Sequence, residues 1–320
     1  MIIDKTIPAG VNWTQSNDTD GGWYSLCVTL TGRIIVGSAG GAGIWYSDDN
    51  GVNWAQSNKT DDSWNALCVT STGRIIAGSI SSYGIWYSDD NGINWTQSNK
   101  TDDDWYALCV TSTGRIIAGS NMNDIWYSDD NGVNWTQSVI TYGAWYSLCV
   151  TPTGRIITGS LNNAGIWYSD DNGLNWVESN KTDGDWRTLR VTSTGRIIAG
   201  SSAGIWYSDD NGVNWAQSNK IDGNWLTLCV TSTGKVIAGG NHIGIWYSDD
   251  NGVNWLQSNK TNGEWFALYV IPTGRAIAGS LANGIWYSDT VTIIKATKYM
   301  NKAAVQELVT QFKAYVQSKK

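Results

Sequence analysis

A unit of about 40 residues, present seven times, limits the folds open to this chain more than any other feature. Three tryptophans recur at equivalent positions of the units and form three columns when the units are aligned. The first column is the tryptophan of IWYS, the second, which begins at Trp13, lies in NWxQS segments, and the third, which begins at Trp23, precedes Leu-Cys-Val runs. Seven units with three tryptophans each account for all 21 in the chain, and a period of this length is typical of solenoids and propellers. The members of the first column are Trp45, Trp86, Trp126, Trp167, Trp206, Trp246 and Trp286.

Each unit contains four short segments with strand character. In the second unit these are WNALCVT, GRIIAGS, GIWYSDD and NWTQSN, and the connectors between them are rich in Gly, Asn, Asp and Ser. Four antiparallel strands per unit predict an all-β fold, a seven-bladed β-propeller of four-stranded antiparallel blades over residues 1–290. The capping units that a solenoid needs are not visible.

The two ends of the repeat predict how the ring closes. The last unit stops after its third strand at Tyr287-Ser288-Asp289, whereas the chain begins with an isolated fourth strand at residues 10–16. Pairing these two segments removes an open sheet edge. We therefore expect the N-terminal strand to complete blade seven.

The turn between the third and fourth strands has the pattern Ser-x-Asp-x-Gly-x-x-Trp, written SDDNGVNW from Ser47 to Trp54. It resembles the Asp-box, or BNR, repeat of sialidases and related propellers. The resemblance implies a structural hairpin in which Asp and Ser bind backbone groups, Gly supplies permissive dihedral angles and Trp fills the core. It implies the fold and not an activity. Close copies begin at Ser88, Ser128, Ser169, Ser208 and Ser248.

Comparison among the repeats distinguishes the two faces of the ring. The STGR and SDDNG turns at one face are nearly identical, whereas the second-to-third connections at the other face vary. At the variable face we expect clefts in which indoles stack on sugars while carboxylates or amides bind hydroxyls, with seven sites acting together. The alternative is that a tryptophan present in every blade packs between blades. The candidate carbohydrate-binding residues are Trp23, Trp64, Trp105, Trp145, Trp186, Trp225, Trp265, Asp20, Asp61, Asp102, Asp183, Asp222 and Asn262.

Catalysis and metal binding are not predicted. The sialidase resemblance implies an arginine triad, but six of the eight arginines occupy the same repeated position in their units. Only Arg187 and Arg190 stand at positions where the other units have no arginine, and two residues cannot form a triad. Two glutamates lie in different units and the third in the tail, which does not favour a carboxylate pair. SDDNG lacks the bidentate Glu of a calcium loop, and the sole histidine, His242, has no partners for a zinc site.

We therefore expect a non-enzymatic, multivalent carbohydrate-binding protein, similar to propeller lectins, with glycans as partners and no cofactor. A structural or protein-docking module is the alternative, and a glycosidase is third. The net charge of −7 argues against nucleic acid as a ligand, and no apolar run approaches the roughly 20 residues of a spanning helix. The start, MIIDKT, lacks the features of a signal peptide and predicts a protein made in the cytoplasm.

Residues 291–320 differ in character from the repeats and form a second predicted region, a linker and an amphipathic α-helix over 301–318. Its apolar stripe would dock on the ring or pair with copies of itself in a homo-oligomer. The stretch KYMNKAAVQELVTQFKAYV resembles a Tyr-Leu-Asp-x-x-Gly-Leu-x-x-Leu-Trp-x-x-Ile-Lys element of phage tail and fibre proteins, with Ala304 in place of its Gly and Val309 of its Trp. That resemblance implies a virion or tail-like particle and a host-glycan adhesin.

Overall fold

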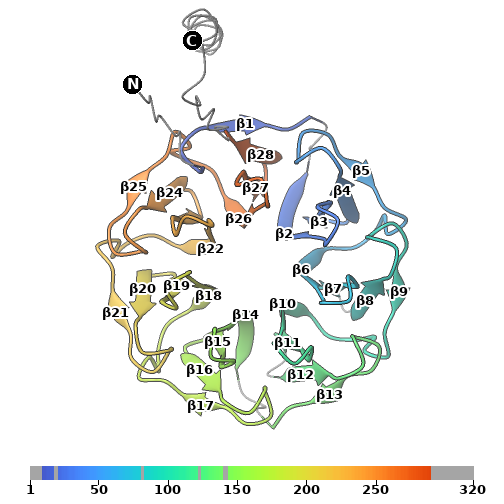
Figure 1. Ribbon diagram of the computed structural model, residues 1–320, viewed down its shortest axis with the longest axis horizontal. Coiled ribbons are helices and arrows are strands. Elements are labelled where there is room, and N and C mark those ends of the chain that lie inside the picture. Colours follow the sequence, from blue (N-terminus) through green and yellow to red (C-terminus); the bar gives the residue numbers. More distant parts are fainter. Residues whose placement is uncertain (1–8, 18–20, 81–82, 122–123, 140–142, 290–320) are drawn as a thin grey trace, which may run out of the picture. The chain divides into compact units, whose positions relative to one another are not determined.

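The computed structural model describes residues 9–17, 21–80, 83–121, 124–139 and 143–289. Ala9–Asp289 forms one compact unit, in which seven four-stranded antiparallel sheets surround a central channel (Figure 1). The predicted seven-bladed propeller is therefore confirmed. The predicted C-terminal helix is not supported, because residues 290–320 lie outside the described part of the chain.

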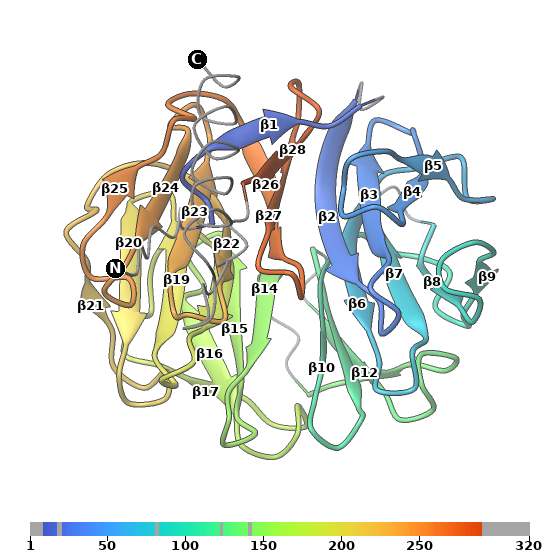
Figure 2. The same cartoon turned by 45° about the horizontal axis from the view of Figure 1, so that its top comes forward.

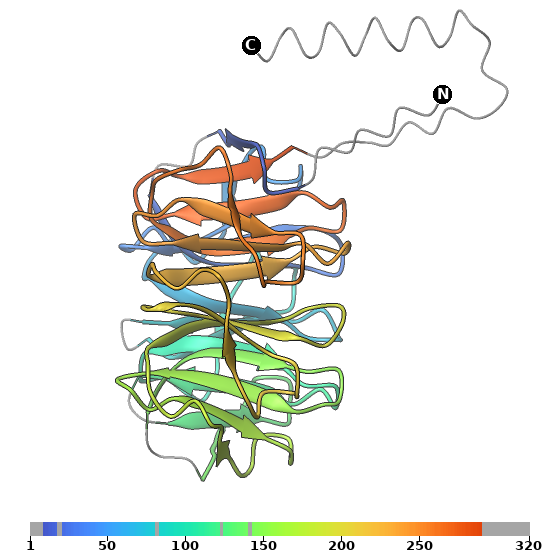
Figure 3. The same ribbon diagram turned by 90° about the vertical axis from the view of Figure 1, so that its left-hand side faces the viewer.

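The strands follow the same order in each blade, from the channel outwards, and run between the two faces of the ring (Figure 3). The innermost strands are β2 (Gly22–Val28), β6 (Trp64–Val69), β10 (Trp105–Val110), β14 (Ala144–Val150), β18 (Trp186–Val191), β22 (Trp225–Val230) and β26 (Trp265–Val270). The second strands are β3 (Ile34–Ala39), β7 (Ile75–Ser79), β11 (Ile116–Ser120), β15 (Ile156–Leu161), β19 (Ile197–Ser201), β23 (Val236–Gly240) and β27 (Ala276–Ser280).

The outer half of each blade is completed by a short third strand and a shorter fourth one. The third strands are β4 (Ile44–Ser47), β8 (Ile85–Ser88), β12 (Ile125–Ser128), β16 (Ile166–Ser169), β20 (Gly204–Ser208), β24 (Ile245–Ser248) and β28 (Ile285–Ser288). The fourth strands are β5 (Ala55–Gln56), β9 (Thr96–Gln97), β13 (Thr136–Gln137), β17 (Val177–Glu178), β21 (Ala216–Gln217), β25 (Leu256–Gln257) and, for blade seven, β1 (Trp13–Gln15).

The ring closes as the sequence predicts. Strand β1 pairs antiparallel with β28, so that Trp13 lies opposite Ser288 and Gln15 opposite Trp286 (Figure 2). The Ser16 amide extends the ladder by donating to the Ile285 carbonyl at 2.8 Å. Because the first strand of the chain completes the last blade, the ends of the repeat are joined by hydrogen bonds, and blade seven has four strands like the other blades.

Packing between neighbouring blades explains the sequence of the second strands. Their residues are buried along the whole strand, because each sheet has a blade on both faces, so the apolar and small residues run continuously instead of alternating. Ile76 of one blade packs with Trp105 of the next. A Cβ at Gly78 would lie only 2.6 Å from the Trp105 Cβ, so the close approach of two blades requires glycine there.

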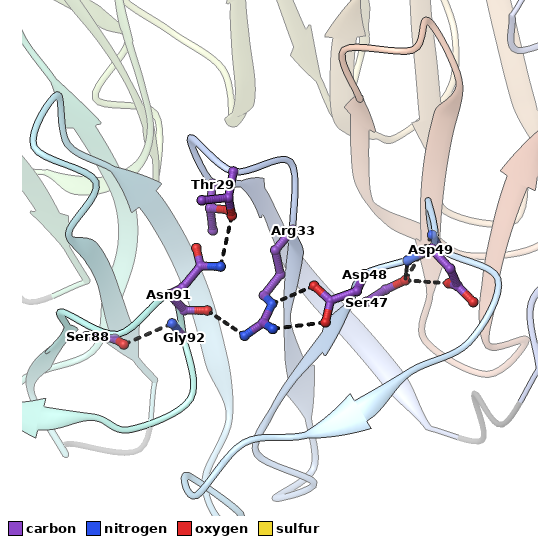
Figure 4. Close-up of polar contacts among 10 residues, drawn as sticks. Thr29, Arg33, Ser47, Asp48, Asp49, Ser88, Asn91 and Gly92 are labelled. Atoms are coloured by element: carbon purple, nitrogen blue, oxygen red, sulfur yellow. Dashed lines mark hydrogen bonds and ion pairs between the residues drawn. The ribbon is translucent and has the colours of Figure 1, made fainter.

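The invariant turns of the repeat form a network at one face of the ring (Figure 4). Within a turn, the Ser47 hydroxyl donates to Asp49 Oδ1 at 2.9 Å and accepts the Gly51 amide at 3.0 Å. Within its own blade, the Arg33 guanidinium donates to Asp48 at 2.7 and 2.9 Å, and it reaches the next blade by donating to the Asn91 carbonyl at 3.2 Å. The repeated arginine column is thus structural and joins each turn to the next blade.

Candidate functional site in the central channel

The tryptophans predicted to stack on sugars lie inside the protein. Trp64 and Trp105 are 0% exposed and Trp23 is 1% exposed, and the other four members of this column are equally buried. The Trp64 indole N–H donates to the Asp61 carbonyl at 2.8 Å, and Trp105 does the same to Asp102. These indoles therefore pack between blades, as in the alternative interpretation, and offer no free face to a ligand.

Lysines occupy the predicted clefts in several blades. The Lys59 Nζ lies 4.0 Å from the ring centroid of Trp86 and 5.4 Å from that of Trp64, and 2.8 Å from Asp61 Oδ1. The same arrangement recurs at Lys100, where the ion pair lowers the pKa of Asp102. The structure thus places these carboxylates beside the tryptophans but pairs them with lysine. Asp183 and Asp222 form ion pairs with Lys181 and Lys220, respectively. The backbone carbonyl of Asn262 accepts the Trp265 indole N–H, and Asp20 lies outside the described residues.

A different column of the repeat faces the channel, one residue after the buried tryptophan. In each blade this residue coincides with a β-bulge, where the register between the first and second strands shifts, as between Trp186 and Thr188. A bulged residue leaves the regular alternation of the strand, and bulges often re-aim a side chain near a functional site. We call these seven residues the channel ring: Tyr24, Asn65, Tyr106, Tyr146, Arg187, Leu226 and Phe266.

The channel ring lines a cavity of about 330 Å³ and is chemically uneven around its circumference. Tyr106 and Tyr146 stack with their ring centroids 3.9 Å apart, and Arg187 follows them in the next blade. On the other side, Leu226 and Phe266 form an apolar stretch, and Tyr24 contacts Phe266 edge-on at 5.0 Å. Because most other strand positions are similar from blade to blade, this variation breaks the sevenfold symmetry of the channel.

Two arginines give the cavity its charge. Arg187 Nε is buried without a hydrogen-bond partner, and Arg187 forms no ion pair with any described residue. Arg190 lines the same cavity and donates to the Leu189 carbonyl at 2.8 Å. The described residues that line the cavity include no Asp or Glu. The cavity is therefore cationic although the chain as a whole carries a net charge of −7.

The phenols of Tyr146 and Tyr24 are neutral hydrogen-bonding groups at ordinary pH. Burial, and then a hydrogen bond with Tyr106, raise the pKa of Tyr146 well above its ordinary value, while the Arg187 charge opposes this shift. Burial, the Tyr106 phenol and the Glu264 carboxylate raise the pKa of Tyr24. Glu264 Oε1 lies 2.8 Å from His242 Nε2. The cavity can thus offer a cation, hydroxyl groups and aromatic surfaces to one ligand.

In the described part of the chain, no group of three or more His, Cys, Asp or Glu is arranged to hold a metal ion. Within the same residues, no helix is long and apolar enough to cross a membrane. All five cysteines are free thiols, and burial raises the pKa of each, as at Cys27.

Sequence reasoning missed most of the channel ring. It singled out Arg187 and Arg190 as private to one blade but used them only to reject an arginine triad. The available signal was the variation of the column after Trp23 and its equivalents, which reads Tyr, Asn, Tyr, Tyr, Arg, Leu, Phe in otherwise similar segments. Variation within a repeat marks positions that the common turn and core geometry does not determine.

Comparisons with known proteins support the fold. Residues 86–97 match the model of the BNR/Asp-box repeat, and no curated protein matches the sequence. A streptogramin B lyase structure is 13% identical, with 88% of this chain and 97% of that chain covered and a TM-score of 0.73. YCF48 bound to D1 peptide is 17% identical, with coverages of 90% and 98% and a TM-score of 0.69. The GH74 enzyme of Niastella koreensis is 15% identical, with coverages of 85% and 43% and a TM-score of 0.66.

These likenesses correct the functional prediction. The expectation of a non-enzymatic lectin rests on the repeat and on the lack of a symmetry-breaking catalytic set in the sequence. Propellers of similar architecture include a lyase and a GH74 enzyme, so this architecture gives no ground for excluding catalysis. The prediction of a non-catalytic carbohydrate-binding protein is therefore wrong. At these identities the likeness establishes the fold alone, and the resemblance of the tail to phage elements is not confirmed.

Proposed function

We propose that the protein binds, at the channel ring, a ligand in which an anionic group adjoins an aromatic or aliphatic group. Arg187 would hold the anion, the phenols of Tyr106 and Tyr146 would flank it, and Leu226 and Phe266 would contact the apolar part. Arginine suits this role because its guanidinium presents donors in a planar fork that matches a carboxylate. The proposal concerns binding and leaves open whether a reaction follows.

The observation that supports the proposal is one nitrogen of the Arg187 guanidinium. Its Nε is buried and has no hydrogen-bond partner, and no carboxylate lines the cavity among the described residues. A buried charged donor without a partner is unfavourable, whereas a ligand carboxylate would satisfy it through charge-assisted hydrogen bonds. The two arginines that line the cavity also attract anions from solution. The structure of YCF48 bound to D1 peptide agrees with ligand binding by a propeller of this kind.

The test compares acids with their neutral amides. We would measure the binding of 3-phenylpropionate and 4-methylpentanoate, and of the corresponding amides, by calorimetry and ligand-observed NMR. Because hydrogen bonds to a charged group contribute about 1.5–3 kcal/mol, we expect the acids to bind at least about tenfold more tightly than the amides. Arg187→Gln should remove that preference.

Arg275→Gln is the matched control. Arg275 donates to the Asn50 carbonyl at 3.3 Å, in the column of arginines at the opposite face, so its loss should leave acid binding unchanged. Equal binding of acids and amides, binding of neither, or full retention of the preference in Arg187→Gln would overturn the proposal. A thermal melt of each variant verifies that the ring is folded.

A further inference from the structure

A second cation lies below the channel ring in the same strand. Arg190 follows Arg187 by three residues in β18, and both line the cavity of about 330 Å³. At about 3.3 Å of rise per extended residue, their backbone positions are roughly 10 Å apart along the strand. Since the inner strands run between the two faces, this separation lies along the channel (Figure 3).

Arg190 has no ionic partner among the described residues. It occupies the column that holds cysteine in five other blades and Tyr269 in the sixth. Its charge acts on the thiols of Cys149 and Cys229 and on the phenol of Tyr269, whose pKa values are all raised by burial. These neighbours are therefore neutral at ordinary pH. The hydrogen bond from Nη1 to the Leu189 carbonyl leaves its charge uncompensated.

Between the two arginine levels the cavity is lined by leucines, together with smaller side chains such as Ser25, Ser147 and Thr188. In five blades, a leucine placed between the positions of Arg187 and Arg190 along the inner strand lines the cavity. Leucines of this kind favour a hydrocarbon and offer no polar group to a ligand. The lining leucines are Leu26, Leu67, Leu108, Leu148 and Leu268.

We infer that the channel binds an elongated dicarboxylate, with one carboxylate at Arg187, the other at Arg190, and a hydrocarbon spacer between them against the leucines. The inference rests on the proposed role of Arg187 and adds the ligand class. A monocarboxylate would leave one of two cations in a small cavity without a counter-charge, whereas a dicarboxylate neutralises both. A short dicarboxylate would reach only one arginine because the cations lie at different depths.

The test uses a length series and a charge-matched pair. Succinate, adipate, suberate and sebacate would be titrated calorimetrically against the full chain, and suberate would be compared with its monomethyl ester. We expect affinity to increase along the series to an optimum, and the best dicarboxylate to bind at least about tenfold more tightly than its monoester. Arg190→Gln should abolish this advantage and leave monoester binding within about twofold.

A second variant protects the test against misfolding. Arg190→Cys places at this position the residue that five other blades already hold, so the strand should fold as its counterparts do. It should lose the dicarboxylate advantage to the same extent as Arg190→Gln. If monocarboxylates bind through Arg187 but the second carboxylate of a diacid does not increase affinity, the dicarboxylate inference fails and the proposed function stands. If no carboxylate binds, both fail.

Discussion

Replacing Arg33 by lysine tests whether the arginine column holds adjacent blades together. Arg33 Nε and Nη2 donate to the two Asp48 carboxylate oxygens at 2.7 and 2.9 Å, and Nη1 donates to the Asn91 carbonyl of the next blade at 3.2 Å (Figure 4). Its guanidinium also lies 4.2 Å from the ring centroid of Tyr46. Lysine keeps the charge but lacks the planar fork that makes these contacts together.

The magnitude follows from the individual contacts. The Asp48 side chain is 61% exposed, so weakening its ion pair should cost no more than about 0.5 kcal/mol. Losing the part-buried hydrogen bond to the Asn91 carbonyl should cost about 1 kcal/mol, and losing the stacking on Tyr46 about 0.5 kcal/mol. We therefore expect Arg33→Lys to lower the free energy of unfolding by about 2 kcal/mol.

The assay is thermal and urea unfolding monitored by tryptophan fluorescence. At about 2 °C per kcal/mol for a domain of this size, the melting temperature should fall by about 4 °C. The loss should persist in the Asp48→Asn background and in high salt, because most of it comes from the bond to the neighbouring blade. A loss below about 0.5 kcal/mol, or one that disappears in high salt, would refute the reasoning and reduce Arg33 to a surface ion pair.

Two further predictions concern titratable groups. In the Asp-box turns, partial burial acts to raise the pKa of Asp49. Hydrogen bonds from the Asn53 backbone amide and side chain and from Ser47 outweigh this effect and lower the pKa below its ordinary value. The pKa values of the equivalent residues Asp90 and Asp130 are lowered in the same way. Such carboxylates stabilise the fold above about pH 4, and this contribution is lost as the pH falls through the depressed pKa of the folded state. Melting temperatures measured from pH 7 to 2 should therefore decline below about pH 4, and a flat profile would contradict this prediction. The second prediction concerns the buried thiols, because burial raises the pKa of Cys149 and of Cys229 to about 12. A disulfide reagent at pH 8 should therefore label the five thiols only as the ring unfolds. Rapid labelling of the native protein would contradict this prediction.

Much of this architecture is local and could be predicted. The hairpin around Ser47 and Asp49 is built from contacts within a few residues, so its pattern reveals it in every copy. The closure by residues 10–16 follows from counting strands at the two ends of the repeat. The clefts were mispredicted because the Lys59 side chain that occupies one contacts Trp86 of the third strand as well as nearby Trp64, a combination visible only in three dimensions.

The sequence by itself determined the period, the number of blades, the turn chemistry and the way the ring closes, because each depends on spacing or on neighbours along the chain. Only the tertiary structure decided which residues face the channel. In a propeller both faces of a blade are covered by other blades, so strand alternation does not separate buried from accessible side chains. A β-bulge at the start of each inner strand turns residues such as Arg187 towards the channel, and the assembled ring places Arg187 and Arg190 in one cavity without a carboxylate among its described lining residues.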